Sequence, residues 1–179
     1  MLVNGKERLA CETPVVSVMD RRGAIRLEPL YNFPLVGDLV VDTSRLMVKN
    51  AAIDLPLVRK AEQGTRFEPL MQDGSDVFSR FENCIECGLC VSACPIAAIC
   101  PEFLGPAALA AAERLTAEPR GRDVGGILDL VSKWNGLWRC HQAFECSQVC
   151  PADVDPSQAI RILQRWLAFG KSDQHRYLG

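Results

Sequence analysis

The chain contains 179 residues, 48% of them hydrophobic and 23% charged, which is the balance of a globular protein of one domain, or of one domain and a fragment. Its net charge of −2 gives no electrostatic case for nucleic acid binding, and no apolar run approaches the roughly 18 residues that span a bilayer. Nine cysteines occur without a secretory signal pattern, so we expect a reducing compartment in which thiolates bind metal.

Residues 1–37 are expected to form short β strands. The pair Asn4–Gly5 is typical of a type I′ turn, so the segments on either side of it predict a hairpin. Gly23 would supply a second turn farther along the chain. The expected strands are Met1–Val3, Arg8–Cys11, Val15–Met19 and Ala24–Leu27.

Helical patterning is expected to begin near Asp38, which can cap a helix. The apolar residues at near-helical spacing are Leu39, Val40, Leu46 and Met47. Prolines and glycines interrupt the pattern from Pro56 to Ser75, which indicates a connector. Residues 38–75 are therefore interpreted as a helix followed by a connector.

Residues 76–179 are predicted to be mainly helical. Pro106 suits the first position of a helix, and Asp155 can cap another that starts at Pro156. The expected helices are Asp76–Glu82, with Phe78 and Phe81 as core residues, Ala107–Glu118, Ile127–Trp134, and a last helix with an apolar stripe of Ala159, Ile160, Leu163 and Leu167. The fold class is therefore α+β, mainly α.

The segment Cys84–Pro95, with the sequence CIECGLCVSACP, carries the clearest chemical signal in the chain. Cys84, Cys87 and Cys90 recur every three residues and can wrap one side of a cubane iron–sulfur cluster. Cys94 follows at a spacing of four, directly before a proline. In two-cluster ferredoxins with such a run, the fourth cysteine ligates the other cluster. The run therefore predicts a second cluster and a second set of cysteines.

That second set lies 56 residues farther along the chain. The repeat-equivalent positions hold Cys140, Ala143, Cys146 and Cys150, and a proline follows the last of them. By the same crossover, Cys150 should complete a [4Fe–4S] site with Cys84, Cys87 and Cys90. The second cluster then has Cys94, Cys140 and Cys146, with Ala143 at the fourth corner, and three thiolates fit a [3Fe–4S] cluster.

Two other interpretations of these cysteines are weaker. A disulfide framework belongs to small secreted domains. Zinc sites usually use paired C-x2-C knuckles, whereas this chain has a compact triple followed by a cysteine–proline pair. Cys100, six residues after Cys94, is a competing fourth ligand of the second cluster or a small buried thiol.

Three segments together resemble the iron–sulfur subunit of succinate dehydrogenase and fumarate reductase: CIECGLCVSACP, PEFLGPAALAAAERL and WRCHQAFECSQVCPADVDPSQAI. The similarity runs from about residue 1 to residue 165, and the FLGPAAL piece is independent evidence because it contains no cysteine. The resemblance implies a helical two-cluster ferredoxin domain at residues 76–179, preceded at residues 1–37 by a remnant of a plant-type (β-grasp) [2Fe–2S] ferredoxin domain.

The resemblance also implies a function and partners. Such subunits carry electrons between a FAD-containing flavoprotein subunit, which interconverts succinate and fumarate, and a membrane anchor that binds quinone. The resemblance implies the same division of the cysteines between the two clusters, with the three-iron cluster nearest the quinone. It also implies a peripheral location on the cytoplasmic side of the membrane. The chain has no G-x-G-x-x-G flavin motif, so the dicarboxylate chemistry is expected on a partner.

Cys11 is interpreted as an orphaned [2Fe–2S] ligand, because MLVNGKERLACET resembles the hairpin and fourth cysteine of the plant-type domain. Such a site also needs a C-x4-C-x2-C loop, which this sequence lacks. We therefore expect a truncated start, or a split gene that supplies the first half. Strand edges would then be unpaired and Val3, Val15 and Leu27 exposed.

The quinone, on this hypothesis, approaches the three-iron cluster near Trp138, His141 and the segment Ile96–Ile99. His141 follows a ligand cysteine and could hydrogen-bond a quinone, although a surface or anchor-interface role is equally consistent. Relatives that reduce ubiquinone often have a tryptophan where Ile99 falls. Some menaquinone-linked fumarate reductases have a lysine where Gln164 falls.

Two other functions remain open at the level of sequence. One is a two-cluster subunit of a glycolate-oxidase or heterodisulfide-reductase type of enzyme, although those usually carry later CCG segments and no cysteine follows Cys150 here. The other is a zinc-stabilised interaction module, which would lack the broad brown absorption of iron–sulfur clusters.

Overall fold

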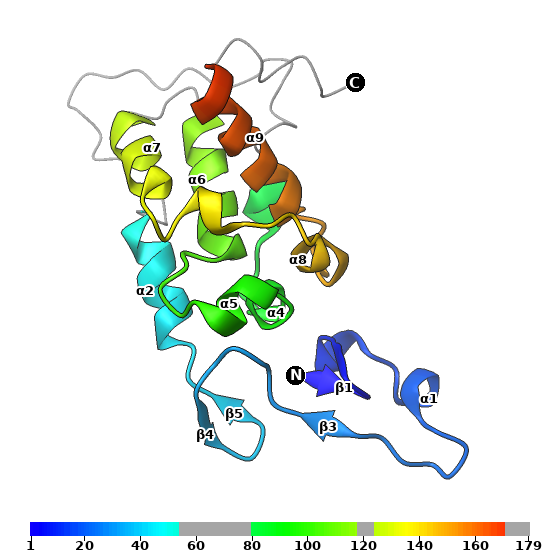
Figure 1. Cartoon of the computed structure of the whole chain (residues 1–179). Coiled ribbons are helices and arrows are strands. Elements are labelled where there is room, and N and C mark those ends of the chain that lie inside the picture. The colour runs from blue at the N-terminus through cyan, green and yellow to red at the C-terminus, as the bar shows by residue number, and fades with distance from the viewer. Residues whose placement is uncertain (54–79, 118–123, 171–179) are drawn as a thin grey trace, which may run out of the picture.

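The computed structural model describes residues 1–53, 80–117 and 124–170. A small β-containing region at the N-terminus lies against one end of a helical body (Figure 1). The expected connector at Pro56–Ser75, Phe78 and the beginning of the helix expected at Asp76–Glu82 lie outside the described residues. The end of that segment forms a 3-10 turn, η2, at Arg80–Asn83.

The N-terminal hairpin is confirmed, with shorter strands than expected. β1 (Leu2–Val3) pairs antiparallel with β2 (Lys6–Glu7) on one side and with β3 (Leu27–Glu28) on the other. Asn4 and Gly5 have φ values of 52° and 76°, which is the pair of left-handed conformations that a type I′ turn requires. The second strand was expected at Arg8–Cys11, but Ala10–Glu12 forms a 3-10 turn, η1.

Three further expectations for this region were wrong. Val3 is buried rather than exposed, because β1 is the central strand of the three. The segment expected as a strand at Val15–Met19 forms a short helix, α1 (Val15–Val18), in which the backbone N–H and the hydroxyl of Ser17 both donate to the carbonyl of Pro14. The strand expected at Ala24–Leu27 begins only at Leu27, which is exposed as expected.

The helix expected from Asp38 starts six residues later. Asp38 has a φ of 50° and lies in the turn between β4 (Leu35–Gly37) and β5 (Val40–Val41), so Leu39 and Val40 belong to a hairpin. α2 spans Ser44–Ala52, and the carboxylate of Asp42 accepts hydrogen bonds from the backbone and hydroxyl of Ser44 at its start. The N-cap residue of α2 is Thr43, whose side chain makes no capping hydrogen bond, so Asp38 does not cap this helix as expected.

The helical body is built around α6 (Pro106–Ala117), whose residues from 106 to 116 are all buried. α9 (Pro156–Phe169) packs along α6, while α7 (Val124–Ser132) and α2 contact it elsewhere (Figure 1). Pro106 occupies the first turn as expected, and α7 begins three residues earlier than expected. The core contains Phe103, Leu109, Val131, Leu137, Ile160 and Leu163, with Phe81 partly buried against it.

The last helix begins as the sequence predicts. The side chain of Asp155 accepts a hydrogen bond from the backbone N–H of Gln158 and so caps α9, and Pro156 follows. In the expected apolar stripe, Ala159, Ile160 and Leu163 are buried and Leu167 is partly buried against the core. None of the helices in the described parts of the chain is both long enough and apolar enough to cross a membrane.

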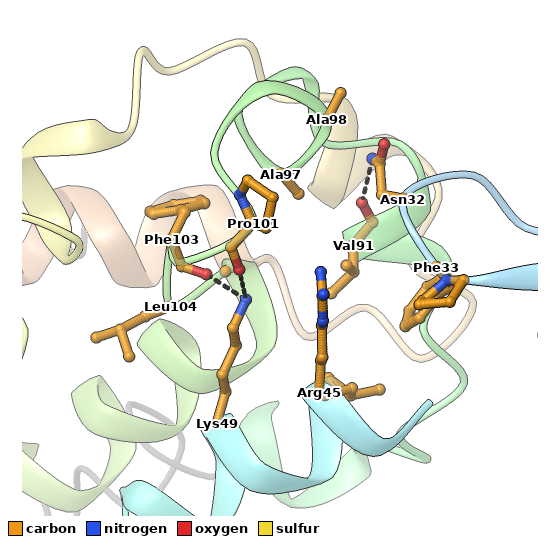
Figure 2. A pocket seen from close by; sticks show the side chains of 13 residues that line it. Asn32, Phe33, Arg45, Lys49, Val91, Ala97, Ala98, Pro101, Phe103 and Leu104 are labelled. Atoms are coloured by element: carbon orange, nitrogen blue, oxygen red, sulfur yellow. Dashed lines mark hydrogen bonds between the residues drawn. The ribbon is translucent and has the colours of Figure 1, made fainter. Parts of the chain in front are cut away.

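The N-terminal region is joined to the helical body by hydrogen bonds to α4 (Leu89–Ser92). The hydroxyl of Ser92 donates to the carboxylate of Glu7 (3.0 Å) and accepts from the backbone N–H of Tyr31 (3.0 Å). The amide nitrogen of Asn32 donates to the carbonyls of Val91, Ser92 and Cys94 at 2.8, 2.8 and 3.0 Å, and Figure 2 shows the first of these bonds. These contacts fix the end of α4 against the N-terminal strands.

Glu113 is a buried carboxyl group that should make stability pH-dependent. It lies on α6 with 6% of its surface exposed, and burial raises its pKa from 4.5 to about 7. Below pH 4.5 both the folded and unfolded chains hold the proton. Between pH 4.5 and 7 the unfolded chain loses it first, so the free energy of unfolding falls as pH rises, by a total on the order of 3 kcal/mol.

We therefore expect Glu113→Gln to raise the midpoint of thermal unfolding at pH 8 and to leave it unchanged at pH 4. The matched control is Glu102→Gln, an exposed carboxylate on the loop before α6. An equal stabilisation by Glu113→Gln at both pH values would show that the buried charge is not its cause.

Candidate iron–sulfur sites

The internal repeat seen in the sequence is reproduced in the backbone. Glu86 and its equivalent Gln142 have φ values of 52° and 58°, and Gly88 and its equivalent Phe144 have values of 77° and 64°. A four-residue helix follows each pair, α4 in the first copy and α8 (Glu145–Gln148) in the second, and the two helices contact each other. Two loops with the same pair of left-handed positions therefore lie next to each other.

Only the first loop requires glycine at its second left-handed position. A Cβ atom at Gly88 would lie 3.0 Å from the ring of Phe33, which comes from the N-terminal region. Phe144 occupies the same conformation in the second loop, where its side chain is 43% exposed. The N-terminal region thus packs closely on the first cysteine loop (Figure 2 shows Phe33 beside this loop).

Four cysteines gather around the first loop. Burial raises the pKa of Cys90, and the neighbouring Cys87, Cys146, Cys84 and Cys150 raise it further. Burial likewise raises the pKa of Cys84, with smaller upward contributions from Cys87, Glu86 and Cys150. Cys150 therefore lies within electrostatic range of the first loop, although it is 60 or more residues away in sequence.

Three cysteines gather around the second loop. Burial raises the pKa of Cys146 to about 12, and Cys94 and Cys140 add to the increase. Burial also raises the pKa of Cys140, with Cys94 contributing in the same direction. All three line one small cavity together with Ala143 and His141. The structure thus brings together the residues that the sequence assigned to a second cluster.

The chemistry of both groups fits iron–sulfur clusters. Thiols with raised pKa values become thiolates when metal cations compensate their charge, and soft thiolates are the ligands of iron–sulfur clusters. Backbone N–H groups of Glu86, Gln142 and Val154 donate to the sulfurs of Cys84, Cys140 and Cys150, the last at 3.4 Å. Among the described residues, no group of three or more His, Cys, Asp or Glu side chains is arranged to hold a single metal ion.

The other two cysteines, Cys100 and Cys11, do not line the cavity of the second group. Cys100 is partly buried, its thiol faces the carboxylate of Glu102 at 4.0 Å, and it is not among the residues that line the cavity of the second group. Cys11 is exposed in η1 of the N-terminal region.

Only some of the residues expected near a quinone line the cavity of the second cysteine group. His141 is exposed and lines the cavity of the second cysteine group, as does Ile96. Trp138, in η3 (Leu137–Arg139), and Ile99, in α5 (Pro95–Ile99), are 55% and 78% exposed and do not line it.

Sequence reasoning missed three polar residues near the cysteines. The amide of Gln142 donates to Cys140, Asn50 of α2 bonds to Glu86, and Lys49 lies within electrostatic range of Cys94. The repeat itself could have singled out Gln142, because it is the equivalent of Glu86. No local sequence pattern points to Lys49 and Asn50 of α2, because the residues that they contact are far away in the sequence.

Comparison with known proteins defines the class to which these sites belong. Residues 80–154 match a family described as a 4Fe–4S dicluster domain, and residues 1–48 match a 2Fe–2S iron–sulfur cluster binding domain. The chain is thus an α+β iron–sulfur protein. Its overall fold is similar, with a TM-score of 0.73 and 23% identity, to a chain in a structure of the Mycobacterium smegmatis Sdh1 complex in the apo form, covering 96% of this chain and 72% of that one.

Curated relatives identify the family. The chain is 39% identical to the fumarate reductase iron–sulfur subunit of Mycobacterium tuberculosis, covering 90% of this chain and 65% of the relative, and 37% identical to that of Haemophilus influenzae, covering 89% and 66%. It is 30% identical to the succinate dehydrogenase iron–sulfur subunit of Coxiella burnetii, covering 92% of this chain and 69% of the relative. The chain belongs to the succinate dehydrogenase/fumarate reductase iron–sulfur subunit family, and it spans about two thirds of the length of these relatives.

Proposed function

We propose that this chain is the electron-transfer subunit of a succinate:quinone oxidoreductase or fumarate reductase. The observation that carries the proposal is the crossed arrangement of cysteines, in which Cys150 of the second loop lies with the first group and Cys94 of the first loop lies with the second. A chain that binds two clusters side by side suits the relay of electrons between two partners.

The ligand assignment is part of this proposal. Cys84, Cys87, Cys90 and Cys150 hold a [4Fe–4S] cluster, and Cys94, Cys140 and Cys146 hold a [3Fe–4S] cluster. Such clusters, when bound, supply one-electron carriers whose potentials depend on hydrogen bonds and exposure. The chain orients the thiolates through the two left-handed loops and donates backbone N–H groups to four of the sulfurs, those of Cys84, Cys140, Cys146 and Cys150. Cys94 belongs to the main core cluster, and Cys140 packs against it.

The domain assignment follows from the same reasoning. Residues 76–179 form the helical two-cluster ferredoxin domain, residues 38–75 join it to the N-terminal region, and residues 1–37 represent part of a plant-type [2Fe–2S] domain. The match of residues 1–48 to a 2Fe–2S family supports the last assignment, with Cys11 as one ligand. A [2Fe–2S] cluster would then require three further cysteines from outside this sequence.

The proposed partners are a FAD-containing subunit that interconverts succinate and fumarate and a membrane anchor that binds quinone. In this arrangement the chain is peripheral, on the cytoplasmic side of the membrane. The names of the relatives, which are subunits of fumarate reductase or succinate dehydrogenase, support this arrangement.

Electron paramagnetic resonance (EPR) of the purified complex tests the function. We expect the oxidised complex to give a near-isotropic three-iron signal that disappears when succinate is added, because electrons from the dicarboxylate would then reach this subunit. A sample that contains zinc without iron would overturn the proposal. A sample with both clusters that neither succinate nor fumarate affects would favour another oxidoreductase.

His141 is the residue proposed to face the quinone, because it borders the cavity of the second cysteine group. We expect His141→Ala to lower quinone-dependent turnover at least tenfold through loss of a hydrogen-bond donor or proton source. Transfer of electrons from succinate to an artificial acceptor that bypasses quinone should be unchanged. If quinone turnover stayed intact while both clusters assembled, His141 would have no such role.

A further inference from the structure

The two cysteine loops place different side chains at one repeat-equivalent position. Glu86 and Gln142 each lie two residues after a cysteine, share a left-handed conformation, and donate a backbone N–H to that cysteine. The backbones are thus alike, but the first loop carries a carboxylate where the second carries a neutral amide. Any difference in the surroundings of the two clusters at this position comes from the side chain.

Glu86 is held beside the first cysteine group by α2. The side-chain amide of Asn50, which is buried, donates to the Glu86 carboxylate at 2.9 Å. The charge of this carboxylate acts on Cys84. A fixed negative charge therefore lies next to a proposed [4Fe–4S] ligand.

Gln142 instead presents a hydrogen-bond donor to the second group. Its amide nitrogen lies 3.8 Å from the sulfur of Cys140 and also donates to the side chain of Gln164 on α9 at 2.9 Å. Gln164 in turn donates to the carbonyl of Leu137 at 2.9 Å. This chain of bonds fixes the orientation of the Gln142 amide toward the sulfur.

The ammonium group of Lys49 is a further charged group that α2 holds on the side of the second cysteine group. Lys49, the residue before Asn50 on α2, donates to the carbonyls of Pro101 and Phe103 at 2.7 and 2.6 Å (Figure 2). Cys94, a proposed ligand of the second cluster, is one of the charged groups that act on this ammonium group, after Arg45, Cys100 and Glu102. One helix therefore positions a carboxylate at the first group and a cation near the second.

Reduction adds a negative charge to a cluster, so nearby charges and donors shift its potential. We propose that Glu86 and Gln142 separate the potentials of the two clusters, Glu86 lowering that of the [4Fe–4S] cluster and Gln142 raising that of the [3Fe–4S] cluster. The inference rests on the proposed function, because it requires both clusters to be bound. Its consequence is that an added electron resides preferentially at the second site.

An EPR-monitored redox titration of the purified complex measures both potentials separately. We expect Glu86→Gln to raise the midpoint potential of the [4Fe–4S] cluster by the equivalent of about a tenfold change in its ratio of reduced to oxidised forms, which is about 59 mV for one electron. Gln142→Met, which has similar length and no donor, should lower the [3Fe–4S] potential. Each variant should leave the other cluster nearly unmoved.

Asp129→Asn is the matched control, because it removes one carboxylate from the exposed surface of α7 and should shift neither potential. If Gln142→Met prevented assembly of the second cluster, Gln142→Glu would test the same position, with an even lower potential expected. Absence of both clusters from the wild-type complex would overturn the proposed function itself. Intact clusters whose potentials did not respond to Glu86→Gln, or that shifted equally, would overturn only this inference.

Discussion

Cys150→Ser is expected to remove the [4Fe–4S] cluster and to leave the [3Fe–4S] cluster in place. Cys150 belongs to the second loop by sequence, but in the structure it lies within electrostatic range of Cys84 and Cys90, and the cavity of the second group does not include it. Serine is a poor ligand for iron in place of a thiolate, so the first site would have three good ligands instead of four. The reduced four-iron EPR signal should disappear and iron analysis should show a loss of at least one iron atom per chain, while the three-iron signal of the second cluster persists.

Two variants serve as comparisons for this experiment. Cys100→Ser should retain both clusters, because its thiol faces Glu102 instead of either group. Cys94→Ser should give the opposite result, with the three-iron signal lost and the [4Fe–4S] cluster retained. If Cys150→Ser removed the three-iron signal instead, the crossed ligand assignment would be wrong.

Ala143→Cys is expected to convert the second cluster into a four-iron cluster. Ala143 lines the same cavity as Cys94, Cys140 and Cys146 and occupies the position that Cys87 has in the first loop. A thiol there would supply the missing fourth ligand without a change in the surrounding backbone. We expect the oxidised three-iron EPR signal to disappear and a reduced four-iron signal to replace it, with one more iron atom per chain.

Ala143→Ser is the control for this substitution, because it adds a side chain of similar size without a thiolate, and it should retain the three-iron signal. Persistence of that signal in Ala143→Cys, with the new thiol still open to alkylation, would show that the side chain does not reach the cluster. Cys100 would then become the residue to test as a fourth ligand.

The cysteine spacing could be interpreted as two cluster sites because only a few spacings allow one loop to supply several ligands to an iron–sulfur cluster. The 56-residue repeat predicted the two groups that the structure brings together, and Asn4–Gly5 predicted a hairpin because that pair suits one turn type. The starts of α6 and α9 were also predictable, since Pro106, Asp155 and Pro156 act locally.

Other features depend on contacts that local sequence does not encode. The valine-rich run at residues 15–18 favoured a strand, but a turn closed on the carbonyl of Pro14 makes it helical. Asp38 is a plausible cap by local pattern, but pairing of β4 with β5 places it in a hairpin turn, and α2 starts only at Ser44. Lys49 and Asn50 reach the cysteine groups only because α2 packs on α6.

The three hydrogen bonds of Asn32 have a consequence for the order in which the molecule assembles. They end on carbonyls of residues 91, 92 and 94, within the same segment that carries Cys90 and Cys94. Loosening of this segment would release the N-terminal strands at the same time, so the two regions open as one cooperative unit. Iron binding should make the segment that carries the first cysteine loop more rigid. Amide hydrogen exchange in β1 should therefore slow, although β1 itself contains no cluster ligand.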